Sequence, residues 1–374
     1  MFSILQNRLC DFGITRLSFI DGLGDCPISV SQVFRPSSRS LTSSSGKGFD
    51  PISSLVAGIM ESLELMHAEQ VEKQQEKLIC VNKSHFCHDN PSAEKFLMLM
   101  GIQNKRDFLY PMFQSENLTT STDSFVPWES VMMIPTQHDH KLVPSSNGLA
   151  SGSNIIEASI SALCEIIERD SEAMSYINKN IEVIDLSSII NPELSSLIET
   201  LEQLNLLIKI EHLSNPYSLP VMRCILWNKS GIGWEGPFGG CAADVSRDRS
   251  LIAAITEALQ AMVIHIAGAR DDIRFNPSKK LSSIEKGENP ADFNSVPDYP
   301  GLSNQVALLD FLLSMCKAAN INTVHRVLLS EDPDYAVVKL TSPDMSFIHH
   351  GHPKVIGYQL REAIKANQSK VINK

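Results

Sequence analysis

Apolar residues recur at helical spacing in several segments of the chain. Leu55, Ile59 and Leu63 predict a helix over residues 52–75. Asp50 and Pro51 come directly before it, and this pair is typical of a helix start, because Asp caps free N–H groups and Pro suits the first helical position. Further helices are predicted to begin near Asn154 and to cover 249–269, 305–319 and 354–374.

Shorter apolar runs between these helices predict strands. The predicted strands are 130–134, 181–184, 206–210, 219–227, 323–328 and 335–340. The Ser/Gly-rich stretch 36–48 reads as a flexible loop, 231–240 as a glycine-rich turn region, and the proline-containing stretch 271–300 as a long loop. Helices and strands intermix without a regular βαβ repeat, so the pattern predicts an α/β or mixed α+β fold with mixed sheets flanked by long helices.

Composition narrows the class of protein. Hydrophobic residues make up 43% of the chain and charged residues 20%, as in soluble globular proteins. The formal net charge of −11 argues against a nucleic-acid binder or a protein drawn to anionic membranes. No apolar run approaches the roughly 20 residues of a membrane span, and the start of the sequence lacks a signal-peptide pattern, so a cytoplasmic location is expected. The eight cysteines form no CxxC pair and read as reduced thiols.

Glutamates fall on one side of three predicted helices: Glu61 and Glu64 on the first, Glu157, Glu165 and Glu168 on the second, and Glu257 on the third. The three on the second helix lie within an arc of roughly 80°. The simplest interpretation of one such helix is a solvated face. Three helices of the same style favour a second interpretation, in which the carboxylates converge on Mg²⁺, which prefers carboxylate oxygens and brings substrate phosphates with it.

Other chemical motifs are weak or absent in the sequence. Lys47 lies in Ser-Gly-Lys-Gly, which lacks the spacing of a P-loop. No GxSxG or HExxH motif occurs. The histidine groups at 85–88, 138–140 and 349–352 have no closed four-ligand spacing for zinc and read as solvated loop histidines.

The residues around the second glutamate helix resemble a known family. Ser146-Asn-Gly-Leu-Ala-Ser-Gly152, followed by Glu157, Glu165 and Glu168-Arg169-Asp170, is similar to the YcaO signature. The match extends to Ser45-Gly-Lys-Gly48 before Glu61 and Glu64, and to Glu257-Ala-Leu-Gln260 with Arg270-Asp-Asp272. Arg35-Pro-x-Ser-Arg39 and His67-Ala-Glu69 look like the TfuA-associated branch of that family.

This resemblance implies a single YcaO-like domain over 1–374, with a core at 11–272 and a looser subregion at 301–374. It implies ATP and Mg²⁺ as cofactors, held without a P-loop. It also implies an enzyme that activates a peptide-backbone amide by O-phosphorylation to give a thioamide, azoline or amidine. The implied nucleotide- and metal-binding residues are Lys47, Glu61, Glu64, Ser153, Glu157, Glu165, Glu168, Arg169 and Glu257, of which the six glutamates would hold the metal.

The sequence also departs from the family pattern at positions that line the family's nucleotide site. This chain has Ala57 where the family usually has Ser, and Ser153 where the family usually has Asn. It has Ala253 and Met262 at two positions where the family usually has Arg. Two functions therefore stay open. The first is thioamidation or a related modification of a ribosomally made peptide, with a TfuA-like partner. The second is a non-catalytic accessory protein that binds nucleotide or peptide and assists methylthiolation of a ribosomal protein. The family also implies a homodimer.

Overall fold

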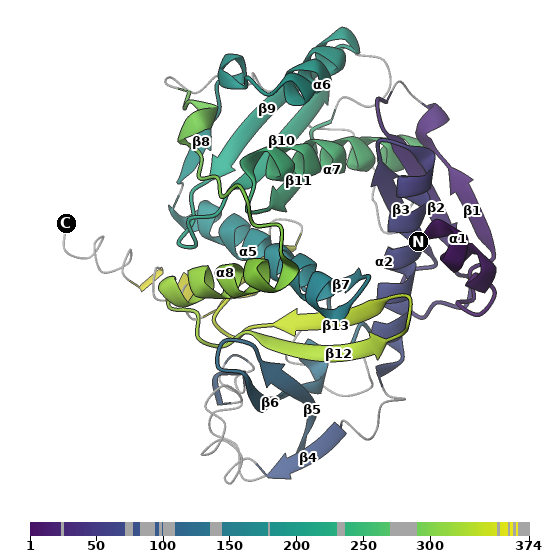
Figure 1. Cartoon of the computed structure of the whole chain (residues 1–374), viewed down its shortest axis with the longest axis vertical. Coiled ribbons are helices and arrows are strands. Elements are labelled where there is room, and N and C mark those ends of the chain that lie inside the picture. The colour runs from purple at the N-terminus through teal and green to yellow at the C-terminus, as the bar shows by residue number, and fades with distance from the viewer. Residues whose placement is uncertain are drawn as a thin grey trace. The chain divides into compact units, whose positions relative to one another are not determined.

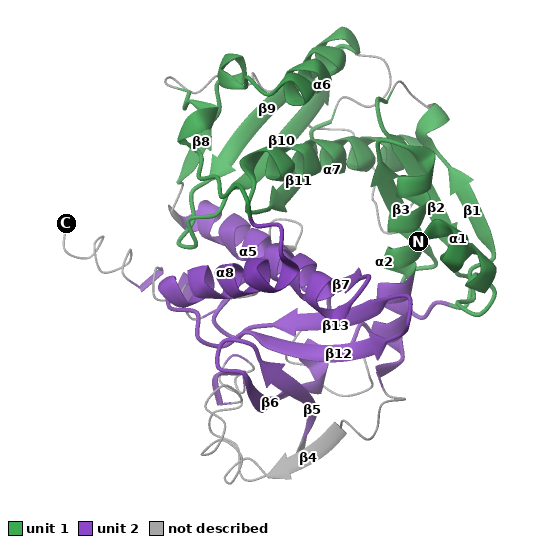
Figure 2. Ribbon diagram, in the orientation of Figure 1, with its two compact units in different colours: residues 1–37, 41–62, 180–301 green, residues 38–40, 63–179, 302–374 purple. Residues whose placement is uncertain are grey.

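The structure is a computed structural model of the whole chain. It describes residues 1–23, 26–71, 78–82, 94–96, 99, 109–134, 144–178, 180–229, 236–269, 290–349, 352–357, 360–361 and 364–365. Contacts divide the chain into two compact units (Figure 2). Unit 1 comprises residues 1–37, 41–62 and 180–301, and unit 2 comprises 38–40, 63–179 and 302–374. The prediction of one domain over 1–374 stays a prediction.

Unit 1 contains two antiparallel sheets. The first joins β1 (Arg16–Phe19), β2 (Ser29–Phe34) and β3 (Ser43–Gly48) in that order, after the short helix α1 (Phe2–Leu5). The second has the order β11 (Phe238–Ala243), β10 (Val221–Asn228), β9 (Leu206–Leu213) and β8 (Ile181–Val183). Helix α6 (Pro192–Gln203) packs on β9, and α7 (Arg247–Ala267) packs on β10 and β11. Figure 1 labels these elements.

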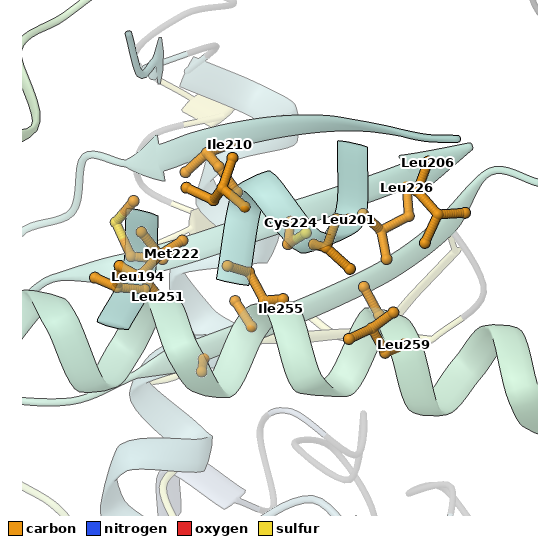
Figure 3. Packing of buried hydrophobic residues seen from close by; sticks show 14 of the residues in the cluster. Leu194, Leu201, Leu206, Ile210, Met222, Cys224, Leu226, Leu251, Ile255 and Leu259 are labelled. Atoms are coloured by element: carbon orange, nitrogen blue, oxygen red, sulfur yellow. The ribbon is translucent and has the colours of Figure 1, made fainter. Parts of the chain in front are cut away.

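One apolar cluster joins the two helices of unit 1 to the second sheet. Met222, Cys224 and Leu226 alternate along β10 and point to the same face, as the period of a strand requires. Leu194 of α6 and Ile255 of α7 meet them there, and all five side chains are fully buried (Figure 3). Burial of this apolar face stabilises unit 1 and fixes α7 against β11.

Unit 2 is built around one antiparallel sheet. Its order is β4 (Leu78–Asn82), β5 (Leu109–Asn117), β12 (His325–Glu331), β13 (Ala336–Thr341) and β7 (Leu149–Gly152), and β6 (Thr122–Pro127) pairs with β5. Helix α5 (Ile155–Asn178) packs on β7 and β13, and α8 (Gln305–Ala318) packs on α5. A small hairpin of β14 (Phe347–His349) and β15 (His352–Val355) follows.

Helix α2 (Pro51–Glu69) contains the boundary between the units, which falls after Ser62. Its start is as predicted: the Asp50 carboxylate accepts hydrogen bonds from the N–H groups of Ile52 (2.9 Å) and Ser53 (3.0 Å). The predicted end at 75 lies outside the described residues. The predictions for α5, α7, α8, β8, β9, β10, β12 and β13 are confirmed within a few residues.

Three sequence predictions are wrong, and one helix was missed. Residues 238–240, at the end of the predicted turn region 231–240, begin β11. Residues 43–48 form β3 rather than part of a flexible loop, because the small side chains allow this strand to lie close to α2, as described below. Residues 130–134 form no strand; a 3-10 turn at Trp128–Ser130 follows Pro127 instead. Helix α6 was not anticipated, although Asn191 caps it and Pro192 opens it. The predicted loop 271–300 and helix 354–374 lie mostly outside the described residues.

The fold class is confirmed as mixed α and β, with long helices on sheets. All strand pairs of the described sheets are antiparallel rather than mixed. Among the described helices, α7 alone is long and apolar enough by composition to cross a membrane, and 56% of that window is buried inside the protein. Since α7 carries part of the core of unit 1, its apolar character follows from packing on the sheet.

Candidate functional site

In unit 2, glutamates from two helices converge on the short segment Gly148–Ser153. The Glu64 carboxylate of α2 accepts hydrogen bonds from the Ser151 N–H (2.8 Å) and from Ser151 Oγ (2.6 Å). Glu165 of α5 accepts one from the Gly148 N–H (3.1 Å). Glu157, in the first turn of α5, accepts one from the Ser153 N–H (2.8 Å) and a second from Ser153 Oγ. Three carboxylates are therefore held in place by main-chain donors.

Two glycines allow this segment to lie so close to its neighbours. Gly148 has φ = +74°, in the left-handed region that favours glycine. Any side chain there would also collide with the Leu340 carbonyl of β13 and come within 2.8 Å of an Ile166 methyl group. A Cβ on Gly152 would lie 2.6 Å from the backbone nitrogen of Ala158 in α5. The SNGLASG sequence thus places a strand end directly against the helix that carries Glu157 and Glu165.

Glu168 and Arg169 lie further along α5. Glu168 is only 7% exposed. Its carboxylate is 3.3 Å from the Arg169 guanidinium, which also lies 3.2 Å from Glu172. The next residue, Asp170, is fully buried and accepts a hydrogen bond from the Ser346 N–H (2.7 Å). Glu168 and Arg169 therefore form an ion pair on the helix, while Asp170 anchors α5 to the loop before β14.

In unit 1, β3 connects the other predicted residues. The Ser45 N–H donates to the Glu61 carboxylate of α2 (2.8 Å), and the Ser45 carbonyl accepts from the Gln260 amide of α7 (2.9 Å). The Lys47 ammonium lies 3.7 Å from the Glu257 carboxylate, and both side chains are about one-third exposed. The strand thus brings one cation and two carboxylates together in unit 1.

Glycines again set the close approach in unit 1. A Cβ on Gly48 would lie 2.8 Å from the Ser53 Cβ of α2. A Cβ on Gly240 of β11 would lie 2.8 Å from the Glu257 Cβ and closer still to the Ala254 carbonyl of α7. Each glutamate helix is therefore seated against a strand that presents glycine to it, which fixes the helix and its carboxylates relative to the strand.

The nine predicted residues thus fall into two sets. Unit 1 holds Lys47, Glu61 and Glu257, and unit 2 holds Glu64, Ser153, Glu157, Glu165, Glu168 and Arg169. Arg270, Asp272 and the first two histidine groups lie outside the part of the chain that the structure describes, so their predictions stay untested.

Sequence reasoning missed Lys339. This residue of β13 is only 2% exposed, and its ammonium donates to the Ser145 carbonyl (2.6 Å). Burial lowers the pKa of Lys339 to about 8, although the charge of Glu165 opposes this shift. The available signal was a single charge within the apolar run Ala-Val-Val-Lys-Leu of a predicted strand. A buried lysine beside the Ser145–Gly148 turn supplies a cation that the motif comparison did not include.

The chemistry of this donor set fits a hard cation with attached phosphates. One oxygen of Glu157 accepts hydrogen bonds from Ser153, and one oxygen of Glu257 pairs with Lys47. Among the described residues, the second oxygen of each carboxylate has no hydrogen-bond or ion-pair partner. Carboxylate oxygens are the ligands that Mg²⁺ prefers. Lys47 and Arg169 offer positive charge suited to phosphate oxygens.

A profile described as YcaO cyclodehydratase, ATP- and Mg²⁺-binding, matches residues 45–346, which is well over half of the chain. The fold and this profile therefore define the class of the protein, which is that of the ATP- and Mg²⁺-binding cyclodehydratases. The chain belongs to the YcaO family. The ATP and Mg²⁺ of the profile are the two cofactors that the sequence predicts.

Individual proteins are also similar to this chain. A protein of Rhizobium leguminosarum bv. trifolii, described as an uncharacterized protein in the tfuA 3′ region, is 25% identical over 297 residues, which are 74% of this chain and 67% of that protein. The structure of YcaO from Methanopyrus kandleri bound with AMPPCP and Mg²⁺ has a TM-score of 0.73 at 18% identity and covers 92% of this chain and 90% of its own.

A heterocyclase in complex with substrate and cofactor also has a TM-score of 0.73, at 16% identity. The match covers 91% of this chain but only 52% of that one. At these identities the two structures establish the fold alone.

Proposed function

We propose that this protein is an ATP-dependent enzyme that activates a backbone amide of a ribosomally made peptide by phosphorylating the amide oxygen. The observation that carries this proposal is the convergence of Glu64, Glu157 and Glu165 on the segment Gly148–Ser153. Carboxylates held this rigidly suit a magnesium–nucleotide complex, because catalysis of phosphoryl transfer depends on positioning and on stabilisation of charge.

The proposed reaction has three steps: attack on the amide carbon, phosphorylation of the amide oxygen, and departure of phosphate. A nucleophile forms a bond to the amide carbon, and the amide oxygen takes the terminal phosphoryl group of ATP while ADP leaves. Inorganic phosphate then departs with the original amide oxygen, which has become a good leaving group. With sulfide as nucleophile, the product is a thioamide, and the overall exchange of oxygen for sulfur consumes one ATP. A cysteine or serine side chain of the peptide would give an azoline instead.

Within this proposal the residues have distinct roles. Glu61, Glu64, Glu157, Glu165, Glu168 and Glu257 would hold Mg²⁺, which would supply positive charge to the phosphates. Lys47 and Arg169 neutralise phosphate charge, since ammonium and guanidinium groups bind phosphate oxygens well. Ser153 stands where the family has Asn, and its N–H and hydroxyl both bind Glu157, so it keeps a link to the metal-binding set.

Thioamidation with a TfuA-like partner is the specific form that we propose. The name of the rhizobial relative, which places it beside tfuA, supports such a partner. We also propose that the protein is cytoplasmic and that it acts as a homodimer.

The second candidate is the accessory protein without turnover, which assists methylthiolation of a ribosomal protein. Four departures from the family pattern favour it, of which Ala253 and Met262 lie on α7. Met262 is 4% exposed, and its thioether brings no charge to a position where the family has Arg.

Co-expression with a candidate precursor peptide and a TfuA-like protein separates the two functions. The enzyme proposal predicts ATP-dependent phosphate release and a peptide whose mass shows exchange of oxygen for sulfur or loss of water. Binding of the magnesium–nucleotide complex without phosphate release, with every partner and peptide tried, would favour the accessory role. The variant Glu165→Gln, compared with Glu199→Gln on the exposed face of α6, tests whether release depends on the proposed site.

A further inference from the structure

Lys339 of β13 is a buried cation to which the proposed function assigns no role. The residue is only 2% exposed, and its neighbours Val338 and Leu340 are fully buried. Burial disfavours a charged ammonium and lowers the pKa of Lys339 to about 8. Because a buried charge is costly unless it is paired and hydrogen-bonded, the contacts of this ammonium indicate its role.

Lys339 and the residue after it attach both ends of one turn to β13. The Lys339 ammonium donates to the Ser145 carbonyl (2.6 Å), at the first residue of the turn. At the last residue of the turn, the Gly148 carbonyl accepts from the Leu340 N–H (2.7 Å). The segment Ser145–Gly148 is therefore held by a side chain at one end and by the main chain at the other.

The last residue of this turn also carries the hydrogen-bond donor of a predicted metal ligand. The Gly148 N–H donates to the Glu165 carboxylate (3.1 Å). A Cβ on Gly148 would lie 2.8 Å from a methyl group of Ile166, so the turn lies directly against this part of α5. A shift of the turn would therefore move the donor that orients Glu165, and metal ligands need placement within about 0.5 Å.

Charge links Lys339 to the same glutamate. Glu129 lines a small cavity of unit 2 together with Lys339 and Ser145. It is the charge of Glu165, however, that acts on the pKa of Lys339, which it raises against the effect of burial. Because electrostatic attraction is mutual, Lys339 acts on Glu165 through its charge as well as through the turn.

We propose that Lys339 is a positioning residue for Glu165, which it orients by holding the Ser145–Gly148 turn and by its own charge. That Glu165 binds Mg²⁺ rests on the proposed function. Lys339 acts on the metal only through this carboxylate. Its substitution should therefore weaken the metal–nucleotide complex while Glu165 is present, and should have little further effect once Glu165 has lost its charge.

A double-mutant cycle on the full chain tests this coupling. The probe is Mn²⁺ with the non-hydrolysable ATP analogue AMPPCP, and electron paramagnetic resonance distinguishes protein-bound from free Mn²⁺. Lys339→Met should weaken binding of Mn²⁺–AMPPCP about tenfold, as expected for a residue that orients a metal ligand. In the Glu165→Gln background, the same substitution should change the affinity less than about twofold. A purely structural role of Lys339 would instead give equal fold-changes in both backgrounds.

Lys95→Met is the matched control. Lys95 is a second lysine of unit 2, and its ammonium pairs with buried Asp344 (2.7 Å). Its substitution should leave the affinity for Mn²⁺–AMPPCP unchanged even if it lowers the unfolding midpoint. Should Lys339→Met fail to fold, Lys339→Gln closes the same cycle, because its amide is uncharged and one bond shorter than the lysine side chain.

Three results would overturn the proposal: unchanged affinity in the Lys339 variant, equal fold-changes in the two backgrounds, or an equal loss of affinity in Lys95→Met. Failure of the proposed function would look different. The wild-type chain itself would then not bind Mn²⁺–AMPPCP, or Glu165→Gln would bind it as the wild type does, and the two proposals would fall together.

Discussion

Two neighbouring glycines of β11 offer a sharp test of how the glutamate helices are seated. Gly240 faces α7, where an added Cβ would lie 2.8 Å from the Glu257 Cβ and closer still to the Ala254 carbonyl. Gly239 faces the other way, and a Cβ there meets nothing within 4 Å. Neither residue has a positive φ, so the two substitutions Gly240→Ala and Gly239→Ala differ in space rather than in backbone strain.

The expected magnitudes follow from this geometry. Ordinary contact begins at 3.4 Å and the added Cβ would lie only 2.2 Å from the Ala254 carbonyl, so Gly240→Ala must displace α7 by about 1.2 Å. Overpacking of this kind costs about 1–3 kcal/mol. Gly239→Ala meets no such overlap and should stabilise by about 0.4–1 kcal/mol, because alanine lowers the entropy of the unfolded chain. The two variants should therefore differ by about 1.4–4 kcal/mol in free energy of unfolding.

Urea denaturation followed by circular dichroism measures this difference, and calorimetry with a non-hydrolysable ATP analogue and Mg²⁺ measures the consequence for the site. The displaced Glu257 should weaken affinity roughly tenfold in Gly240→Ala, since sites of this kind need placement within about 0.5 Å. Gly239→Ala should bind as the wild type does. Equal unfolding midpoints for the two variants would refute the claim that strand glycines set the helix position.

Three further predictions concern stability in denaturation experiments. Burial lowers the pKa of His325 from 6.5 to about 4, so below pH 6.5 the unfolded chain binds a proton at this residue that the folded chain does not bind. The free energy of unfolding should therefore be about 2 kcal/mol lower at pH 5 than at pH 7, and His325→Leu should remove this part of the pH dependence. Glu69→Gln should cost about 2 kcal/mol, since this buried carboxylate accepts from Ser38 Oγ (2.6 Å), and an unchanged midpoint would contradict that role. Arg223→Met should cost about 2 kcal/mol, because buried Glu211 loses its ion pair with Arg223 (2.5 Å) and keeps only the one with Lys209 (2.8 Å); Glu211→Gln combined with it should recover part of the loss if the cost comes from the weakened pairing of this charge.

The sequence predicted the elements whose apolar face repeats regularly. The Asp50 cap with Pro51 located the start of α2, and the spacing of Leu251, Ile255 and Leu259 located α7. The sequence-based prediction failed at β3, because Ser and Gly are typical of loops. Only the close packing of α2 on this strand explains why β3 consists of such small residues. The sequence also missed the β5–β6 hairpin, in which β5 pairs with β12, a strand far along the chain.

The candidate site was predictable in its residue types but not in its geometry. Helical spacing placed Glu157 and Glu165 on one side of α5, but it could not show that their hydrogen-bond donors are the main-chain N–H groups of Ser153 and Gly148. Lys339 is marked in the sequence only as a single charge in an apolar strand, because its partners Ser145 and Glu165 lie far from it in the sequence. Long-range pairing of β13 with β7 creates that contact.

Calorimetric titration with a non-hydrolysable ATP analogue, with Mg²⁺ and then with the metal chelated, tests the central claim most directly. The wild-type chain should bind the analogue only with Mg²⁺. Glu165→Gln should weaken that binding roughly tenfold to a hundredfold, because a neutral amide is a poor ligand for a hard cation, while Glu199→Gln on α6 should leave it unchanged. Equal affinity with and without the metal, or equal affinity of Glu165→Gln and the wild type, would contradict a magnesium–nucleotide site built on these glutamates.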